Sequence, residues 1–470
     1  MKIRFIRYLF FAWAILVLNA CDDYFDVRPK SQVLAEHLFE TEQGFEDQLI
    51  GVYKRLSSTS LYGQEMTYGF MEILSQNYDL ATGNPYEEAG RYNYENTSMK
   101  SIIDQIWAEM YAAIANVNVM LQYVDNDLSI FSDNNHDLYK GEALGLRGFL
   151  HLELLRMFAP AYTSNPSAPA IPYVTEYSPS VTPQSTVEEV LDYIIRDLED
   201  AEALLQPVEG ITTLTHSSYR LTYMSVNAIL ARAYQWKGDM ENALRCARAV
   251  INDPFVQNNY RWVDGSYLNN TEKAYWDRLF SMELLFRLNV SNMDENTNVY
   301  FRNTGDATQK LSPSSEKWND IYEFTSGYGT DWRYSKHWEY DGNDPYFAKY
   351  WQYNGGRYND QVPVVRKSEM YYIAAEALVS KDSIAQAVAY LNEVRTNRNI
   401  SNPLQENLSA ADVQNEIYKE YRKEMVGEGQ LFFYYKRMGY TSIPGSAVSA
   451  SDNVYVLPMP DNEIEFGNRQ

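Results

Sequence analysis

The run from Glu142 to Phe158, EALGLRGFLHLELLRMF, constrains the fold more than any other stretch of this chain. At helical spacing it places Leu146, Leu150 and Leu154 on one stripe, and further apolar side chains fill the flank. A helix that is apolar on more than one side must be covered by other helices, because a surface helix needs a polar face. We therefore predict that this run is a core helix with a structural role.

The first twenty residues have the layout of a secretory signal peptide. Basic residues precede an apolar run from Tyr8 to Leu18, which is too short to span a bilayer as a mature helix. The segment ends in Leu-Asn-Ala-Cys, with Cys21 last, and so resembles a bacterial lipoprotein signal, in which cleavage leaves the cysteine as an acylated N-terminus. A cysteine that merely follows a cleavage site is the alternative. We expect removal of residues 1–20 and a lipid on Cys21 that tethers the chain to a membrane.

Charge and cysteine content exclude several classes of function. A net charge of -23 leaves few cations to displace counterions from a phosphate backbone, so nucleic acid is not an expected partner. Only Cys246 remains beside Cys21, which rules out an intramolecular disulfide in the acylated chain. No cluster of Cys and His has the spacing of a zinc site. We predict no metal site and no cofactor.

Helical patterns continue along the mature chain. Apolar side chains at helical spacing mark 41–53, 102–124, 186–205 and 411–439, and an extended apolar segment at 454–460 is expected to dock on the core. A capping box of Thr186 and Glu189 is expected to open the third of these helices. Residues 219–254, split at 237–239, and a weaker copy at 373–391 resemble tetratricopeptide repeats. The predicted fold class is mainly α, a tetratricopeptide-like solenoid of helical hairpins with long, irregular, loop-rich insertions.

Two stretches interrupt the helical pattern. Residues 76–99 are rich in Asn, Gly and Tyr, which is typical of a surface loop. Residues 255–358 hold six of the nine Trp residues and many Tyr and Phe residues, with little helical period. A loop-dominated segment of this length is usually functional, although its rings could instead pack it against the solenoid. We divide the chain into a signal peptide (1–20), an N-terminal helical region (21–254), an aromatic, ligand-binding insertion (255–360) and a C-terminal helical region (361–470), with 21–470 as one compact unit.

A set of residues spread over nearly the whole mature chain carries a family resemblance. They are Cys21, Phe25, Asp26 and Pro29, the helix 41–53, residues 142–144, 147–156, 233–234, 238–239, 369–377, 391–392, 394–395, Glu420, Arg422, Glu424, 428–429, 432–433, 436–437, Gly439, 457–458, Pro460 and 463–464. With these residues the chain resembles the SusD/RagB-type outer-membrane lipoproteins of the Bacteroidetes. It departs from the family at Leu431, Tyr434 and Met438, where Arg, Asp and Trp are common.

The resemblance implies a function as well as a fold. It implies a lipid-anchored protein of the outer membrane that faces the cell surface. It further implies that the protein sits as a lid on a SusC-like TonB-dependent transporter barrel and captures oligomers for import. The family's glycan sites are arcs of rings and polar side chains on loops, so only the region can be carried over. The expectation is therefore a non-catalytic oligosaccharide-binding protein.

Candidate ligand contacts follow from the chemistry of sugars. A sugar ring stacks its C–H face on Trp or Tyr, and polar side chains then fix its hydroxyl groups. The first loop offers Asn77, Tyr78, Asp79, Asn84, Tyr86, Arg91 and Tyr92, and the insertion offers Trp262, Tyr267, Tyr300, Trp332, Tyr334 and Trp338. We expect the two segments to converge on one face away from the lipid.

Three other functions stay open on the sequence. A surface glycoside hydrolase needs two carboxylates ~5 to 9.5 Å apart, and no local motif selects such a pair. The five His residues are scattered without a nucleophile motif, and His151 is expected to be a satisfied core group. A RagB-like, peptide-binding lipoprotein for oligopeptide import would also use aromatic grooves. A scaffold without a ligand is the third alternative.

Overall fold

The computed structural model describes residues 35–208, 218–291, 293–302, 306–341 and 344–469. The predicted signal peptide and Cys21 lie outside these ranges, as do residues 25–29 of the family resemblance. Within them, no helix combines the length and the apolar character that a membrane span requires.

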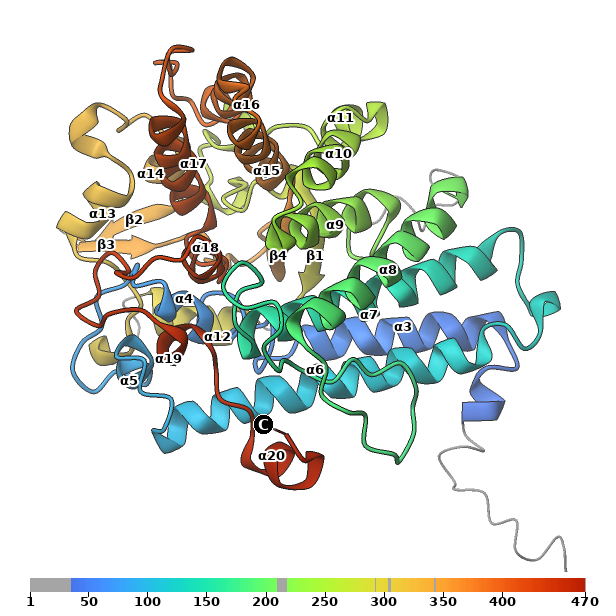
Figure 1. The fold of residues 1–470 in the computed structure, drawn as a ribbon. Coiled ribbons are helices and arrows are strands. Elements are labelled where there is room, and N and C mark those ends of the chain that lie inside the picture. The colour runs from blue at the N-terminus through green and yellow to red at the C-terminus, as the bar shows by residue number, and fades with distance from the viewer. Residues whose placement is uncertain (1–34, 209–217, 292, 303–305, 342–343, 470) are drawn as a thin grey trace, which may run out of the picture.

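Stacked helices form the frame of the molecule (Figure 1). In chain order they are α3 (Glu42–Leu56), α6 (Thr97–Tyr123), α7 (Asn135–Phe158), α8 (Val187–Leu205), α9 (Tyr223–Lys237), α10 (Met240–Ile251), α15 (Lys367–Ser380), α16 (Ile384–Thr396) and α17 (Ala410–Met425). From α6 onward each helix packs against the next in this series, and α10 meets α15 directly although about a hundred residues separate them. The predicted mainly α solenoid with irregular insertions is confirmed.

Helix α7 is the core helix that the sequence predicts. It begins at Asn135, seven residues before the predicted start, and its side chains are buried on all sides from Gly148 to Phe158. Glycines let α8 approach closely, because a Cβ on Gly148 would lie 2.8 Å from Leu198 Cγ and one on Gly141 2.8 Å from Leu205 Cγ. The close crossing of α7 and α8 therefore depends on the absence of side chains at these positions.

His151 is the satisfied core group that the sequence analysis expects. Its ring is fully buried in α7. Nδ1–H donates to the Arg147 carbonyl (2.9 Å), and Nε2 accepts from the Val174 amide (3.0 Å). Burial lowers the pKa of His151 to about 3, so the ring is neutral in the folded protein.

The predicted helix boundaries at 186 and 237–239 are confirmed. The Thr186 hydroxyl accepts from the Glu189 amide, and the Glu189 carboxylate accepts from the Thr186 amide, which completes the capping box. Helix α9 ends at Gly238, whose φ of +80° suits glycine. α10 starts two residues later.

The prediction of one helix at 411–439 is wrong. The structure has α17 and then α18 (Leu431–Arg437), separated by Gly427 (φ +79°) and Gly429 (φ +66°). Left-handed backbone cannot continue an α-helix. The segment 454–460 starts as the short helix α19 (Asp452–Tyr455) and docks as predicted, since the amide of buried Leu457 donates to the Met157 carbonyl (3.0 Å).

The insertion leaves and rejoins the frame at one place. Strand β1 (Leu284–Asn289) pairs antiparallel with β4 (Gln361–Arg366). The elements around and between them are α11 (Pro254–Asn259), α12 (Met293–Phe301), α13 (Ser315–Ile321), η8 (Phe324–Ser326), α14 (Trp332–Lys336) and the hairpin of β2 (Trp338–Asp341) and β3 (Asp344–Phe347). Each is too short to be stable alone, so contacts with the frame must fix them.

Candidate ligand-binding site

Four rings of the insertion form a continuous aromatic row: Phe324 of η8, Tyr334 of α14, Trp318 of α13 and Tyr340 of β2. Phe324 stacks on Tyr334 at 5.1 Å between ring centroids, and Tyr334 stacks on Trp318 at 4.2 Å with 7° between the planes. Tyr340 meets Trp318 edge-on at 5.3 Å. Phe324 is 45% exposed and Tyr340 54% exposed, so both ends of the row reach solvent.

The loop at residues 76–99 contacts the start of α13 through Asp79. Ser314 caps the helix, and its amide donates to Asp79 Oδ2 (2.6 Å). The Lys317 ammonium contacts the other oxygen of Asp79 at 2.5 Å. Although burial alone would raise the pKa of Asp79, the bonds from Lys317 and Ser314 lower it below its ordinary value. The two segments selected from the sequence therefore meet beside the aromatic row.

A left-handed residue places Phe324 on the row. Glu323 follows α13 with φ +52°, which is unfavourable for a residue other than glycine. Its carboxylate is held by Lys419 (2.9 Å) and Lys423 (2.5 Å) of α17. These lysines also lower the pKa of Glu323 against the opposing effect of burial. The two ion pairs stabilise the turn and with it the position of Phe324.

A buried ion cluster positions α14, which carries Tyr334. The guanidinium of Arg333 is fully buried and contacts Asp331 (2.8 Å) on its own turn. On α17 it contacts Glu420 (2.7 Å) and Glu424 (3.1 Å). Burial alone would raise the pKa of Glu424, but the surrounding arginines hold it well below its ordinary value. Glu424 is therefore ionised when it meets the guanidinium.

The same cluster extends to other parts of the insertion. Glu424 also binds Arg398 (2.5 Å), which binds Glu283 (2.6 Å) at the approach to β1. Glu428 binds Arg366 of β4 and Lys349. The acidic residues of α17 and the turn after it, which enter the family resemblance without an assigned role, thus attach the insertion to the frame.

A hollow of about 670 Å³ adjoins the row. Its lining is Glu316, Asn319, Asp320, Ile321, Glu323, Thr325, Ser326, Asn415, Tyr418, Lys419 and Arg422. Asn319 connects it to the row, because its Oδ1 accepts from the Tyr334 hydroxyl (3.3 Å). Amide, carboxylate, hydroxyl and cationic groups thus stand beside stacking rings, an arrangement that suits a polyhydroxylated ligand.

Two family profiles match the chain. The one described as "Starch-binding associating with outer membrane" matches residues 23–235, and the one described as "SusD family" matches residues 257–448. The chain belongs to the SusD/RagB family. This is a family of carbohydrate-binding proteins associated with the outer membrane.

Individual relatives agree with this membership. SusD-like protein P2 of Formosa agariphila is 24% identical over 96% of this chain and 95% of its own length. SusD-like protein P38 of the same organism is also 24% identical, but the match spans only 50% of this chain and 43% of P38.

Solved structures show the shared fold. A SusD-like carbohydrate-binding protein from Bacteroides vulgatus superposes with a TM-score of 0.73 at 20% identity, covering 91% of this chain and 96% of its own. A laminarin-binding SusD-like protein superposes with a TM-score of 0.67 at 20% identity, covering 90% and 97%.

Six residues predicted to contact ligand are buried in this SusD/RagB chain. They are Asn77, Tyr78, Asn84, Tyr86, Tyr92 and Trp338. Several of their polar groups are satisfied inside the protein: Asn77 donates to Glu72 (2.9 Å), Asn84 to the Thr308 carbonyl (2.8 Å) and Tyr92 to the Leu74 carbonyl (3.0 Å). The prediction of ligand contact is corrected for these six, because they form packing and hydrogen bonds beneath the surface.

The other seven candidates lie in different places. Tyr334 is in the row and Asp79 is next to it. Tyr300 packs on Tyr86, and Arg91 forms an exposed ion pair with Glu87. On another part of the insertion, a small cluster around buried Phe280 is flanked by Tyr267 and Trp332, and Trp262 packs on Tyr371.

Phe324, Trp318 and Tyr340 are not among the residues that the sequence singles out. A signal for Tyr340 exists, because Trp338 and Tyr340 are two apart with Glu339 between them on β2. In the structure, however, Trp338 is buried while Tyr340 is exposed. Both rings contact Trp318, but Trp338 also packs on Tyr322 and Phe347, and these contacts arise only in the folded chain.

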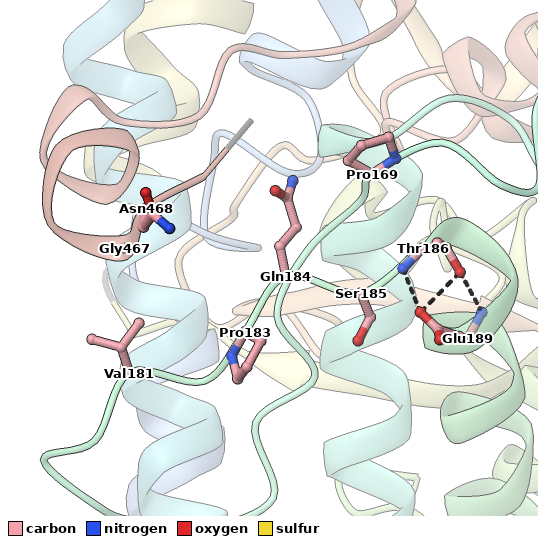
Figure 2. A pocket seen from close by; sticks show the side chains of 9 residues that line it. All are labelled: Pro169, Val181, Pro183, Gln184, Ser185, Thr186, Glu189, Gly467 and Asn468. Atoms are coloured by element: carbon pink, nitrogen blue, oxygen red, sulfur yellow. Dashed lines mark hydrogen bonds between the residues drawn. The ribbon is translucent and has the colours of Figure 1, made fainter.

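Another hollow, of about 430 Å³, has a different character (Figure 2). It lies between the connection that precedes α8 and the end of α20 (Asp461–Gly467). None of the described residues that line it is aromatic, and two of them, Thr186 and Glu189, are engaged in the capping box. Among the described residues, no group of three or more His, Cys, Asp or Glu side chains is placed to hold a metal ion.

Proposed function

We propose that this chain is a lipid-anchored, cell-surface protein that captures oligosaccharides on the aromatic row and delivers them, unmodified, to a SusC-like TonB-dependent transporter. The observation that carries the proposal is the row itself, whose exposed ends adjoin a hollow lined with groups that bind hydroxyls. Stacked rings offer flat faces to sugar C–H groups, and the side chains of the hollow fix the register.

The orientation of the chain supports an outward-facing site. The described chain starts before α3, at the far end of the molecule from α13, α14 and the β2–β3 hairpin (Figure 1). A lipid on Cys21, which precedes α3, would thus tether the end opposite the row. The row would then face away from the membrane.

A binding role without catalysis agrees with the charges of the hollow. A glycoside hydrolase needs a carboxylic acid whose pKa is raised, so that it can protonate the leaving group. Glu323 of the hollow has the opposite property, since Lys423 and Lys419 lower its pKa. It is held as a carboxylate and is already engaged in two ion pairs.

Calorimetric titration with uncharged oligosaccharides tests the proposal. Oligosaccharides of laminarin are the first probe, because a relative with this fold is a laminarin-binding protein. The double variant Phe324→Ala with Tyr340→Ala, here the row variant, is expected to bind at least tenfold more weakly, since each lost ring contact contributes about 1 kcal/mol.

The matched control is Tyr275→Ala, which removes a ring that is 47% exposed outside the row. It should bind as the wild type does. Unchanged binding by the row variant would overturn the proposed site. Binding of a peptide digest in place of every glycan would instead favour the RagB-like alternative.

A further inference from the structure

A second aromatic groove lies on the frame helices, on the side away from the aromatic row. It has a volume of about 630 Å³, which is in the range of small-molecule sites. The lining residues are Arg248, Ile251, Asn252, Tyr371, Gln386, Ala389, Tyr390 and Glu393. They come from α10, α15 and α16 and from the residue that follows α10. In Figure 1, α10 and α13 lie on opposite sides of the group formed by α15, α16 and α17.

The floor of the groove carries a hydroxyl group without a protein partner. Tyr371 is only 8% exposed, and its ring is fixed between Trp262 (5.2 Å) and Tyr390 (5.7 Å). Lys367 Nζ lies 4.2 Å from the centroid of Trp262 and forms a cation–π contact with that ring. Among the described residues, nothing forms a hydrogen bond with the Tyr371 hydroxyl, although Tyr371 lines the groove. A phenol fixed in this way is preorganised to bond a ligand.

The walls supply further polar groups at fixed positions. Arg248 donates from Nε to the Tyr390 hydroxyl (3.2 Å) and from Nη2 to Gln386 Oε1 (3.2 Å). These bonds join α10 to α16 across the groove and orient the guanidinium. Asn252 and Glu393 are exposed at its rim.

The charge of the lining indicates the class of ligand. Among the described residues of the lining, Arg248 is the one cation and Glu393 the one carboxylate, so their charges cancel. Such a lining does not select an anion or a cation, whereas paired donors and acceptors beside a ring suit a neutral polyol. From this juxtaposition of Tyr371, Arg248, Gln386 and Glu393 we propose that the groove is a second glycan-binding site, separate from the aromatic row. The inference rests on the proposed function for the class of ligand only.

The test uses the full chain and the same laminarin oligosaccharides, together with other uncharged oligosaccharides. The wild type is expected to bind two equivalents and the row variant one. Adding Tyr371→Phe to the row variant keeps the ring and removes only the unpartnered hydroxyl. This should weaken the remaining site roughly fivefold to tenfold, as expected for one lost hydrogen bond. Adding Gln386→Ala, at an exposed position, should weaken it as well.

The outcomes separate this inference from the proposed function. If the wild type binds one equivalent and the row variant binds none, the second site is overturned while the row is supported. If the row variant keeps wild-type binding and Tyr371→Phe weakens it, the groove is supported and the row is overturned. If the wild type binds no glycan of the panel, both fail. Equal melting temperatures for Tyr371→Phe and the wild type establish that any loss is local.

Discussion

The helical frame and the aromatic insertion are held in place by different interactions. In the frame, α7 is buried mainly among apolar side chains, with a buried ion pair of Glu153 and Arg156, and Gly148 lets α8 approach it closely. In the insertion, short elements are attached to α17 by buried ions, of which Arg333 and Glu424 are the centre. A packed solenoid can therefore hold irregular segments at fixed positions through charged side chains.

The substitution with the largest expected effect weakens the attachment of the insertion to α17. Glu424→Gln removes the charge that faces Arg398 and Arg333 and leaves both guanidinium groups partly uncompensated in the interior. Loss of one partner from a buried ion cluster costs about 3–5 kcal/mol of the free energy of unfolding. Denaturation by urea measures it. The control Arg91→Ala disrupts exposed pairs only and should cost less than about 1 kcal/mol. A similar small cost for both variants would show that the cluster does not hold the insertion.

The second effect is a pH dependence that resides in the frame. His151 has a pKa of about 3 in the folded protein, against an ordinary value of 6.5. Below about pH 6.5, the His151 ring therefore binds a proton in the unfolded chain but not in the folded chain. Stability falls by about 1.4 kcal/mol per pH unit as the pH decreases from 6.5 toward 3. At pH 5 the loss is about 2 kcal/mol.

The variant His151→Gln keeps a donor and an acceptor but does not titrate. The difference in free energy of unfolding between wild type and variant should change between pH 7 and pH 5 by the amount given above. A constant difference across this interval would contradict the assignment of this slope to His151.

The third effect compares one substitution at two glycines of the frame. Gly148→Ala brings a Cβ to 2.8 Å from Leu198, and overpacking of this kind costs about 1–3 kcal/mol, partly offset by the helix propensity of alanine. Gly51 is exposed on α3 with no atom within 4 Å of its would-be Cβ. Gly51→Ala should therefore stabilise the protein by about 0.5–1 kcal/mol. Thermal melts of both variants check the opposite signs, and equal signs would show that α7 and α8 can separate without cost.

The smallest expected effect on stability belongs to the exposed rings. Phe324→Ala and Tyr340→Ala should each change the free energy of unfolding by less than about 0.5 kcal/mol, because these side chains project beyond the buried ions that fix their elements. Urea denaturation checks this, beside the loss of binding predicted above. A cost of several kcal/mol would mean that the row is part of the core.

Periodicity predicts the frame because its information is local. The apolar stripe of α7, the capping box at Thr186 and the turn at Gly238 each depend on neighbours within a few residues. The break between α17 and α18 escapes this reading. It includes Gly429, which has a positive φ and where a Cβ would lie 2.3 Å from the Met66 carbonyl oxygen.

The candidate site is predictable only as a region. Composition locates the insertion and one ring of the row, Tyr334, but burial of Tyr78 and Trp338 depends on distant packing. Likewise, Arg333 finds its partner Glu420 87 positions away. Ion partners so far apart in the chain produce no periodic pattern in the sequence. The sequence therefore does not distinguish the buried rings of the insertion from the exposed ones.

The ion cluster on α17 has a consequence for how such proteins diversify. It fixes the insertion at a few points, namely Glu283, Arg333, Lys349 and Arg366. Exposed side chains between these points, such as Phe324 and Tyr340, can change without disturbing the interior that carries them. A chain that retains the anchors could therefore acquire a different ligand through substitutions at the exposed positions between them.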